Sequence, residues 1–374
     1  MAGVYIHIPF CRKACHYCNF HFSTSTWLQE SFVKALLQEI NLRKTYFAEP
    51  VATIYFGGGT PSLLPAADIE RIVSALMQNF VVEAGAEITL EANPDDITIE
   101  KLHNWKDIGI NRLSIGVQSF FEEDLKWMNR AHNATQAIDC VQLAHNAGFH
   151  NLTIDLMYGT PTLTDDNWKK NIDTAIALQI PHLSCYALTV EPKTALEKLI
   201  KQKTLADVDA EKQARHFELL MQWMKGNGYD HYEISNFAKP GFRSKHNSSY
   251  WQGKQYIGLG PSAHSFNGSS RQWNIANNAL YIQSLSQGAI SAEKEVLTKE
   301  QQLNEYIMTS LRTMEGLSLQ KVMKDYGEDK YHIVLKTANS HIQHKHLALE
   351  DNHLKTTSEG KLLADGIAAD LFVL

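Results

Sequence analysis

Long apolar runs are missing from this sequence of 374 residues, which nowhere approaches the roughly 18 uninterrupted apolar residues of a membrane-spanning helix. The first residues, Met1 to Tyr5, also lack the basic and apolar regions of a secretory signal peptide. We therefore expect a cytoplasmic protein, which would meet a membrane only through a partner.

Charge of one sign is also scarce. Lys and Arg number 35 against 41 Asp and Glu, which gives a net charge of -6, and no long run of either sign occurs. Because proteins that bind nucleic acid usually carry a strong basic patch, nucleic acid is not an expected partner. The chain has 21 Gly and 10 Pro and no biased tract, so a collagen-like or disordered protein is excluded.

Cysteines number five, an odd count and a low density that do not indicate a disulfide framework. Three of them, Cys11, Cys15 and Cys18, form a C-x₃-C-x₂-C run after the first expected strand. A nearby histidine could complete a zinc site, whereas three thiolates on a cubane iron–sulfur cluster leave one iron open to a ligand. We interpret the run as a cluster site and keep zinc as the alternative. Cys140 and Cys185 lie in apolar patterns and match no metal-binding spacing.

The apolar pattern alternates between strands and helices along the first half of the chain. Expected strands cover 4–8, 53–56, 87–92, 112–117, 151–157 and 182–188, and expected helices cover 27–44, 66–80, 98–108, 134–147 and 165–179. This order is typical of an α/β protein with a parallel sheet. It fits a full or partial (β/α) barrel as well as a doubly wound open sheet, and periodicity alone does not distinguish them.

Polar residues stand near the carboxyl ends of these strands. Glu91 ends the third strand, Gln118 follows the fourth with Arg130 beyond it, and Asp155 lies within the fifth, where alternation would place an apolar residue. Each one alone is compatible with a helix cap, a solvated turn or a surface ion pair. Together they are expected to meet at one mouth, as on the active face of a barrel, and we therefore favour a partial (β/α)₆ barrel.

A run of glycines follows the second expected strand. The sequence Gly57-Gly58-Gly59-Thr60-Pro61 has neither the spaced glycines of a dinucleotide site nor the lysine of a phosphate-binding loop. Glycine permits positive φ and a close approach of the backbone to a ligand. A tight turn between strand and helix would use the same residues.

The regular alternation stops near residue 198, and this change defines the expected domains. We assign residues 1–200 to the barrel core. Residues 201–295, which are rich in Gly, Ser and aromatic side chains, are expected to form a middle segment that closes the barrel mouth. Residues 296–374 carry Leu303, Ile307 and Leu311 on one helical face, which predicts a small, mainly helical C-terminal domain.

The run from Cys11 to Cys18 resembles the signature of the radical S-adenosylmethionine (SAM) superfamily. This resemblance implies a [4Fe-4S] cluster on the three cysteines, with the fourth iron chelated by SAM. The chain further resembles the branch that contains the oxygen-independent coproporphyrinogen III oxidases and the HemW haem chaperones, in segments 5–20, 56–64, 91–94, 111–120, 128–130 and 155–161. The branch implies a radical-SAM TIM-like barrel with a HemN-type C-terminal domain.

The resemblance also implies which residues contact SAM. The matching positions are Tyr5, Gly58, Gly59, Thr60, Glu91, Gln118, Arg130 and Asp155. By this comparison the acids meet ribose hydroxyls and Arg130 pairs with a carboxylate, for which a guanidinium fork is well suited.

The chain departs from the oxidases in two places. The oxidases carry a fourth cysteine two positions after the third, where this sequence has Phe20, and they have a substantial extension before the motif. Both departures favour the haem chaperones. That function implies haem as cargo and a haem-acceptor protein as partner. A coproporphyrinogen III oxidase and a radical SAM methyltransferase acting on haem are the alternatives.

A second motif, His246-Asn247-Ser248-Ser249-Tyr250-Trp251, matches the H-N-x-x-Y-W pattern of the chaperone group. It places an imidazole beside aromatic rings, so His246 is the expected haem ligand, with an ordinary packed loop as the alternative. The glycine-rich segment from Gly258 to His264 resembles the same family and is expected to border the same mouth.

Overall fold

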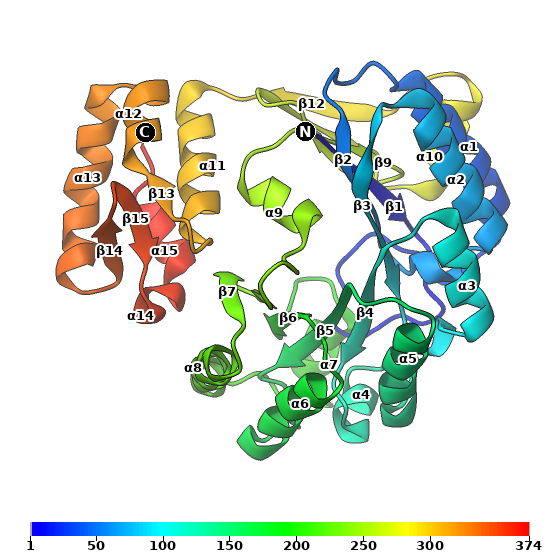
Figure 1. The fold of residues 1–374 in the computed structure, drawn as a ribbon, viewed down its shortest axis with the longest axis horizontal. Coiled ribbons are helices and arrows are strands. Elements are labelled where there is room, and N and C mark those ends of the chain that lie inside the picture. Colours follow the sequence, from blue (N-terminus) through cyan, green and yellow to red (C-terminus); the bar gives the residue numbers. More distant parts are fainter. Residues whose placement is uncertain (1, 374) are drawn as a thin grey trace.

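The computed structural model describes residues 2–373, and its centre is a curved parallel sheet (Figure 1). Six parallel strands pair in chain order: β1 (Ala2–Ile8), β2 (Val51–Gly58), β3 (Val82–Ala92), β4 (Arg112–Gln118), β5 (Leu152–Tyr158) and β6 (His182–Ala187). Their interiors are largely apolar and buried, as expected for strands covered on both faces. The six strands and the helices between them confirm the predicted alternation.

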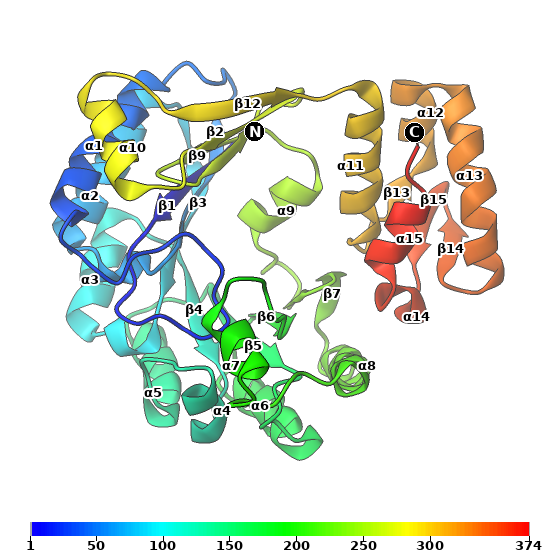
Figure 2. The same cartoon turned by 180° about the vertical axis from the view of Figure 1, so that it is seen from behind.

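Helices cover the outside of this sheet (Figures 1 and 2). They are α1 (Gln29–Leu42), α2 (Ala66–Asn79), α3 (Ile99–Ile108), α5 (Ala134–Asn146) and α6 (Asp165–Ala177), with single 3₁₀ turns η1 (Pro61–Leu63) and η2 (Pro94–Asp96). Two shorter helices, α4 (Glu122–Trp127) and α7 (Ala195–Lys201), pack together beside the loop that follows β1. Thr98, Asn133 and Thr164 cap α3, α5 and α6 by accepting a backbone N–H, which fixes where each helix begins. Because the six strands are parallel, the loops that follow their carboxyl ends all lie at the same edge of the sheet.

The barrel does not close, because each outer strand of the six pairs with a strand from the middle segment. β1 pairs in parallel with β9 (Tyr256–Leu259), and β6 pairs antiparallel with β8 (Asn236–Ala238). With β7 (Asp230–Glu233), β10 (His264–Phe266), β11 (Ser270–Asn274) and β12 (Ala292–Val296), residues 2–373 form one twelve-stranded sheet in the order β12-β11-β10-β9-β1-β2-β3-β4-β5-β6-β8-β7. This arrangement confirms the partial barrel.

Three helices accompany the strands of the middle segment: α8 (Ala210–Gly226), α9 (Lys245–Trp251) and α10 (Asn278–Ser286). In Figures 1 and 2, α9 stands in the opening of the curved sheet, between the parallel strands and the C-terminal unit. It contacts β1 and β2 on one side and α11 on the other. The H-N-x-x-Y-W motif forms this helix and joins the two parts of the molecule.

The C-terminal unit has a hydrophobic core of its own. It comprises α11 (Lys299–Leu311), β13 (Leu317–Ser318), α12 (Leu319–Tyr326), α13 (Glu328–Gln343), β14 (Leu347–Glu350), β15 (His353–Thr356), α14 (Ser358–Lys361) and α15 (Ala364–Asp370). Leu303, Ile307 and Leu311 lie in that core, as their spacing predicts, but a three-stranded sheet accompanies the helices. None of the helices within residues 2–373 combines the length and hydrophobicity that a bilayer crossing requires.

A buried carboxylate joins α1 to the strands of the middle segment. Glu39 is fully buried and forms an ion pair with Arg43 at 2.9 Å. Its oxygens also accept hydrogen bonds from the backbone N–H of Gly260 at 2.8 Å, Asn274 Nδ2 at 2.7 Å and the Tyr281 hydroxyl at 2.6 Å. These donors follow β9, end β11 and lie in α10, so one side chain ties the β9–β11 extension to the barrel.

Replacing Glu39 with Ala should destabilise the protein by about 3–5 kcal/mol, because Arg43 and three further donors would lose their buried acceptor. The matched control is Glu30→Ala on the same helix, whose ion pair with Lys34 is exposed and should matter little. Urea unfolding followed by circular dichroism measures both variants. Equal midpoints would show that the Glu39 network does not anchor the extension.

Candidate functional site: two adjoining cavities

The loop between β1 and α1 brings the three clustered cysteines to the carboxyl ends of the parallel strands. It is held by backbone hydrogen bonds from Cys11 N–H to Ser23 O at 3.0 Å and from His16 N–H to Met128 O at 3.2 Å. Cys11, Cys15 and Cys18 are free thiols, and all three border one cavity of about 460 Å³. We call this space the thiol cavity.

The arrangement of the thiols bears on the two metal interpretations. Within residues 2–373, no group of three or more His, Cys, Asp or Glu side chains is arranged to hold a single metal ion. A zinc site needs its ligands around one ion, whereas in a cubane cluster each thiolate binds a different iron. All three thiols border one cavity, so the structure brings together the three ligands that a cluster would use. Cys140 and Cys185 are buried in the core, as predicted.

The glycine run after β2 packs against the cysteine loop. Gly59 N–H donates to Ile8 O at 2.9 Å and Thr60 N–H donates to Phe10 O at 2.7 Å. A Cβ on Gly59 would lie 2.7 Å from both of those carbonyl oxygens, so glycine is required there by the protein's own backbone. The Thr60 hydroxyl donates to Cys11 Sγ at 3.5 Å. Gly58, Gly59 and Thr60 all border the thiol cavity.

Arg130 joins the cysteine loop to the sheet. One guanidinium nitrogen contacts Cys15 Sγ at 3.2 Å and the Tyr17 hydroxyl at 3.3 Å, and the other donates to Asn93 Oδ1 at 2.8 Å and Gly116 O at 2.7 Å. The buried Nε–H has no partner among the described residues. Protein atoms thus occupy the fork that was expected to bind a carboxylate, and Arg130 orients the loop that carries Cys15.

Two carboxylic acids line the inner wall of the thiol cavity. Glu91 accepts a hydrogen bond from the Tyr55 hydroxyl at 2.7 Å, and burial raises its pKa to about 7. Burial likewise raises the pKa of Asp155 to about 6, against the opposing effects of Ser184 and nearby arginines. Both acids therefore change charge near neutral pH, which is typical of functional sites.

Gln118 completes the wall. It ends β4 with a φ of 66°, a left-handed conformation, and it is buried. The thiol cavity thus brings together the three cysteines and seven of the other expected residues: Gly58, Gly59, Thr60, Glu91, Gln118, Arg130 and Asp155. Tyr5 does not border it: its ring stacks on Tyr55, on the same face of the sheet as Glu91, and borders a second cavity.

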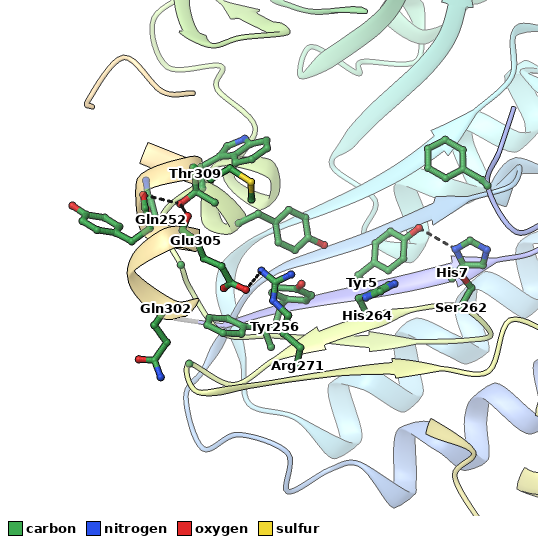
Figure 3. Close-up of a pocket in the computed structure, with 18 of the residues that line it drawn as sticks. Tyr5, His7, Gln252, Tyr256, Ser262, His264, Arg271, Gln302, Glu305 and Thr309 are labelled. Atoms are coloured by element: carbon green, nitrogen blue, oxygen red, sulfur yellow. Dashed lines mark hydrogen bonds and ion pairs between the residues drawn. The ribbon is translucent and has the colours of Figure 1, made fainter. Parts of the chain in front are cut away.

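This second cavity, of about 760 Å³, lies between the sheet and the C-terminal unit (Figure 3). Aromatic side chains dominate its wall, and we call it the aromatic cavity; they are Tyr5, Phe20, Tyr250, Trp251, Tyr256, Phe266, Tyr306 and Tyr326. Asn19 and Phe20 border both cavities, so the two spaces adjoin at the end of the cysteine loop. Phe20, which stands where the oxidases have cysteine, is 67% exposed.

Cationic groups from both sides of the molecule reach the aromatic cavity. Arg271 on β11 forms an ion pair with Glu305 on α11 at 2.9 Å, which Figure 3 shows bridging the sheet and the C-terminal unit. Lys321 on α12 lies over the Tyr306 ring, 4.4 Å from its centroid. Sequence reasoning missed these residues, because nothing local in the pattern places α11 and α12 opposite β11.

His246 does not fulfil its expected role. It is buried, and neither cavity includes it. Its Nδ1 is 2.8 Å from Thr53 Oγ1 and its Nε2 is 2.8 Å from the Tyr250 hydroxyl, so both ring nitrogens are engaged. The H-N-x-x-Y-W motif instead places Tyr250 and Trp251 at the aromatic cavity. His246 holds α9 against β2 through its contact with Thr53. In this structure His246 therefore lies outside both cavities, packed between β2 and Tyr250.

Comparisons with known proteins agree with this architecture. The Radical SAM superfamily model matches residues 5–175. The haem chaperone HemW of Bacillus subtilis is 35% identical, with 98% of each chain covered, and that of Mycobacterium tuberculosis is 32% identical, covering 99% of this chain and 94% of the relative. HemW of Escherichia coli is 38% identical over 70% of this chain and 69% of its own.

A solved structure shares the whole fold. Coproporphyrinogen III oxidase (HemN) from Escherichia coli, a radical SAM enzyme, superposes with a TM-score of 0.85 and 24% identity, covering 100% of this chain and 90% of that one. At this identity the likeness shows the fold alone. The identity to the curated chaperones extends over nearly the full chain, and this chain therefore belongs to the HemW family of radical SAM proteins.

Proposed function

We propose that this protein is a haem chaperone that carries a SAM-ligated [4Fe-4S] cluster, binds haem and passes it to an acceptor protein. Membership of the HemW family supports this function. The structural observation that carries it is the pair of adjoining cavities, one with three thiols and two titrating acids and one with an aromatic wall. A cluster with its cofactor and a flat aromatic cargo would need two such different sites.

The thiol cavity suits the cluster and SAM. Cys11, Cys15 and Cys18 would each ligate one iron, and when bound the cluster and SAM supply one-electron chemistry. Glu91 and Asp155 offer acceptors to ribose hydroxyls, and Arg130 holds the Cys15 loop in place. The buried Nε–H of Arg130 has no partner among the described residues and remains available to a ligand, and the half-buried Gly58 and Gly59 border the same cavity.

The aromatic cavity suits haem. A porphyrin presents two apolar faces and two carboxylates at one edge, so it needs ring contacts and cations together. The wall offers aromatic side chains, with Arg271 and Lys321 as the cations. Phe20 contributes its ring here and replaces the fourth thiol of the oxidases, which supports haem handling over decarboxylation.

The cluster assignment predicts different outcomes for the two kinds of cysteine. Ser replacements at Cys11, Cys15 or Cys18 should each prevent assembly of a full cluster, because one iron loses its thiolate. Ala replacements at Cys140 and Cys185 serve as controls and should retain it, since both thiols are buried away from the cavity. Iron, sulfide and visible absorbance are measured after anaerobic reconstitution. A full cluster in the Cys15→Ser variant would refute the assignment.

The SAM assignment predicts that Glu91→Gln and Asp155→Asn each weaken SAM binding by about 1.5–3 kcal/mol, roughly 10- to 150-fold, through loss of a charged hydrogen bond. The iron content should not change. Glu83→Gln, at the opposite end of β3, is the control. Calorimetry on the reconstituted protein measures the affinities, and wild-type binding by both cavity variants would contradict the prediction.

The same acids predict a pH dependence of SAM binding. Ribose hydroxyls donate to the ionised acids, and burial raises the pKa of Glu91 to about 7 and that of Asp155 to about 6. Lowering the pH through this range protonates both acids, so SAM affinity should fall between about pH 8 and about pH 5.5. Tyr55, Ser184, Arg112 and Arg130 face these acids, and the raised pKa values of Tyr55 and Arg130 lie above that range. Calorimetry across the range should show proton release on binding at the lower end.

The chaperone assignment predicts haem uptake without oxidase activity. The reconstituted protein should bind haem tightly, yet form no protoporphyrinogen from coproporphyrinogen III with SAM and a reductant. Absorbance titration measures the first property, and chromatography of the porphyrins measures the second. Multiple-turnover protoporphyrinogen formation would overturn the chaperone assignment, because Phe20 would then be compatible with decarboxylation.

A further inference from the structure

We infer that His264 is the axial ligand of the haem iron in the aromatic cavity, an inference that rests on the proposed haem-binding function. An imidazole that ligates iron must present a ring nitrogen free of other bonds, and it must be held in place by its surroundings. Three histidines border the aromatic cavity: His7, His21 and His264. The structure distinguishes them by what their ring nitrogens contact.

The first two histidines already form hydrogen bonds within the protein, His7 through both ring nitrogens and His21 through one. His7 is buried, with Nδ1 3.2 Å from the Tyr5 hydroxyl and Nε2 2.8 Å from His21 O. His21 Nε2 is 2.7 Å from Asn278 Oδ1, which ties the cysteine loop to α10. Iron ligation by the bonded nitrogens would break these contacts and leave buried polar groups without partners.

The third histidine is available. His264 is exposed to the cavity, as Figure 3 shows, and its ring nitrogens have no hydrogen-bond partner within residues 2–373. Its ring stacks on Trp273, with 6.1 Å between the centroids and 29° between the planes. An open nitrogen on a ring held by stacking is the combination that a metal ligand needs.

The backbone beneath His264 is also fixed. His264 begins β10 and pairs with Trp273 of β11. A Cβ on Gly258 of β9 would lie only 2.1 Å from His264 O, so the two strands are in closer contact than any other residue at position 258 would allow. The neighbouring Ser265 hydroxyl accepts the Gly258 N–H at 2.9 Å. This close packing supports a precise position for the imidazole.

Other ligand types in the cavity are less suitable. Tyrosine ligates haem iron as the phenolate. Burial raises the pKa of Tyr5, Tyr250 and Tyr256, which keeps these hydroxyls protonated near neutral pH. The cysteines border the other cavity, where the cluster is proposed to lie. Of the three imidazoles on this wall, His264 is the exposed one, with both ring nitrogens free of hydrogen bonds within residues 2–373.

Haem titration of the full-length, reconstituted protein tests the inference. Loss of even an outer partner of a metal ligand costs about 10- to 100-fold in affinity, so His264→Ala should weaken haem binding at least about tenfold. Its ferric spectra, by absorbance and by electron paramagnetic resonance, should also lose the signature of histidine ligation. His21→Ala is the comparison variant and should keep the wild-type haem spectra, and iron content is measured in both variants so that a loss of the cluster is separated from a loss of haem ligation.

A second variant gives a readout that does not depend on affinity. In His264→Cys, the iron should acquire a thiolate ligand, and the ferrous carbonyl adduct should show the red-shifted Soret band typical of that ligation. Wild-type spectra and affinity in His264→Ala, or an unshifted band in His264→Cys, would overturn the ligand assignment while haem binding itself stands. Loss of the histidine signature in His21→Ala alone would also overturn it. A wild-type protein that binds no haem would refute the proposed function, and the ligand with it.

Discussion

The parallel pairing of β1 with two neighbours, β2 on one edge and β9 on the other, is the constraint on which both cavities depend. The carboxyl end of β1 leads into the cysteine loop, and its body supplies Tyr5 and His7 to the aromatic wall. A strand that is hydrogen-bonded on both edges cannot shift without breaking two ladders. The two cavities are therefore held at a fixed separation. Glu39 in α1 stabilises the β9 edge by accepting a hydrogen bond from the Gly260 N–H.

Several residues that the sequence assigns to ligands instead hold the protein around them. Both terminal nitrogens of Arg130 contact the cysteine loop or the strand ends. Gly59 has no Cβ, which allows its backbone to lie close to the backbone at the end of β1. A site residue must be positioned to within a fraction of an ångström, so the loop that carries it needs stabilising contacts of its own. Most of the expected positions border the thiol cavity, but their spacing in the sequence does not show whether a polar atom faces a ligand or a neighbouring loop.

The β/α alternation and the placement of the cysteines could be predicted because both follow from local pattern: long apolar periods and a loop directly after a strand. The β9–β12 extension could not, since its strands are three to five residues long and their pairing is set by distant segments. The packed position of His246 could not be predicted for the same reason, because Thr53, which contacts its ring, lies 193 positions earlier in the chain. The cations of the aromatic wall, Arg271 and Lys321, come from elements that meet only in the folded protein.

The two cavities also differ in how their titratable groups affect the stability of the folded protein. Burial raises the pKa of Glu91 and of Asp155, so the folded state binds more protons than the unfolded chain, and stability declines as the pH rises through about 4 to 7. A ligand that brings hydroxyl donors and a positive sulfonium to these acids would offset the free-energy cost of burying their ionised forms. Part of the ligand's affinity would come from this compensation. The aromatic wall carries no unpaired acid of this kind, because Glu305 is matched by Arg271. On the proposed function, haem binding there would depend on apolar contact and on the His264 imidazole, whereas SAM binding would depend on the charge of the two acids, although Phe20 borders both cavities.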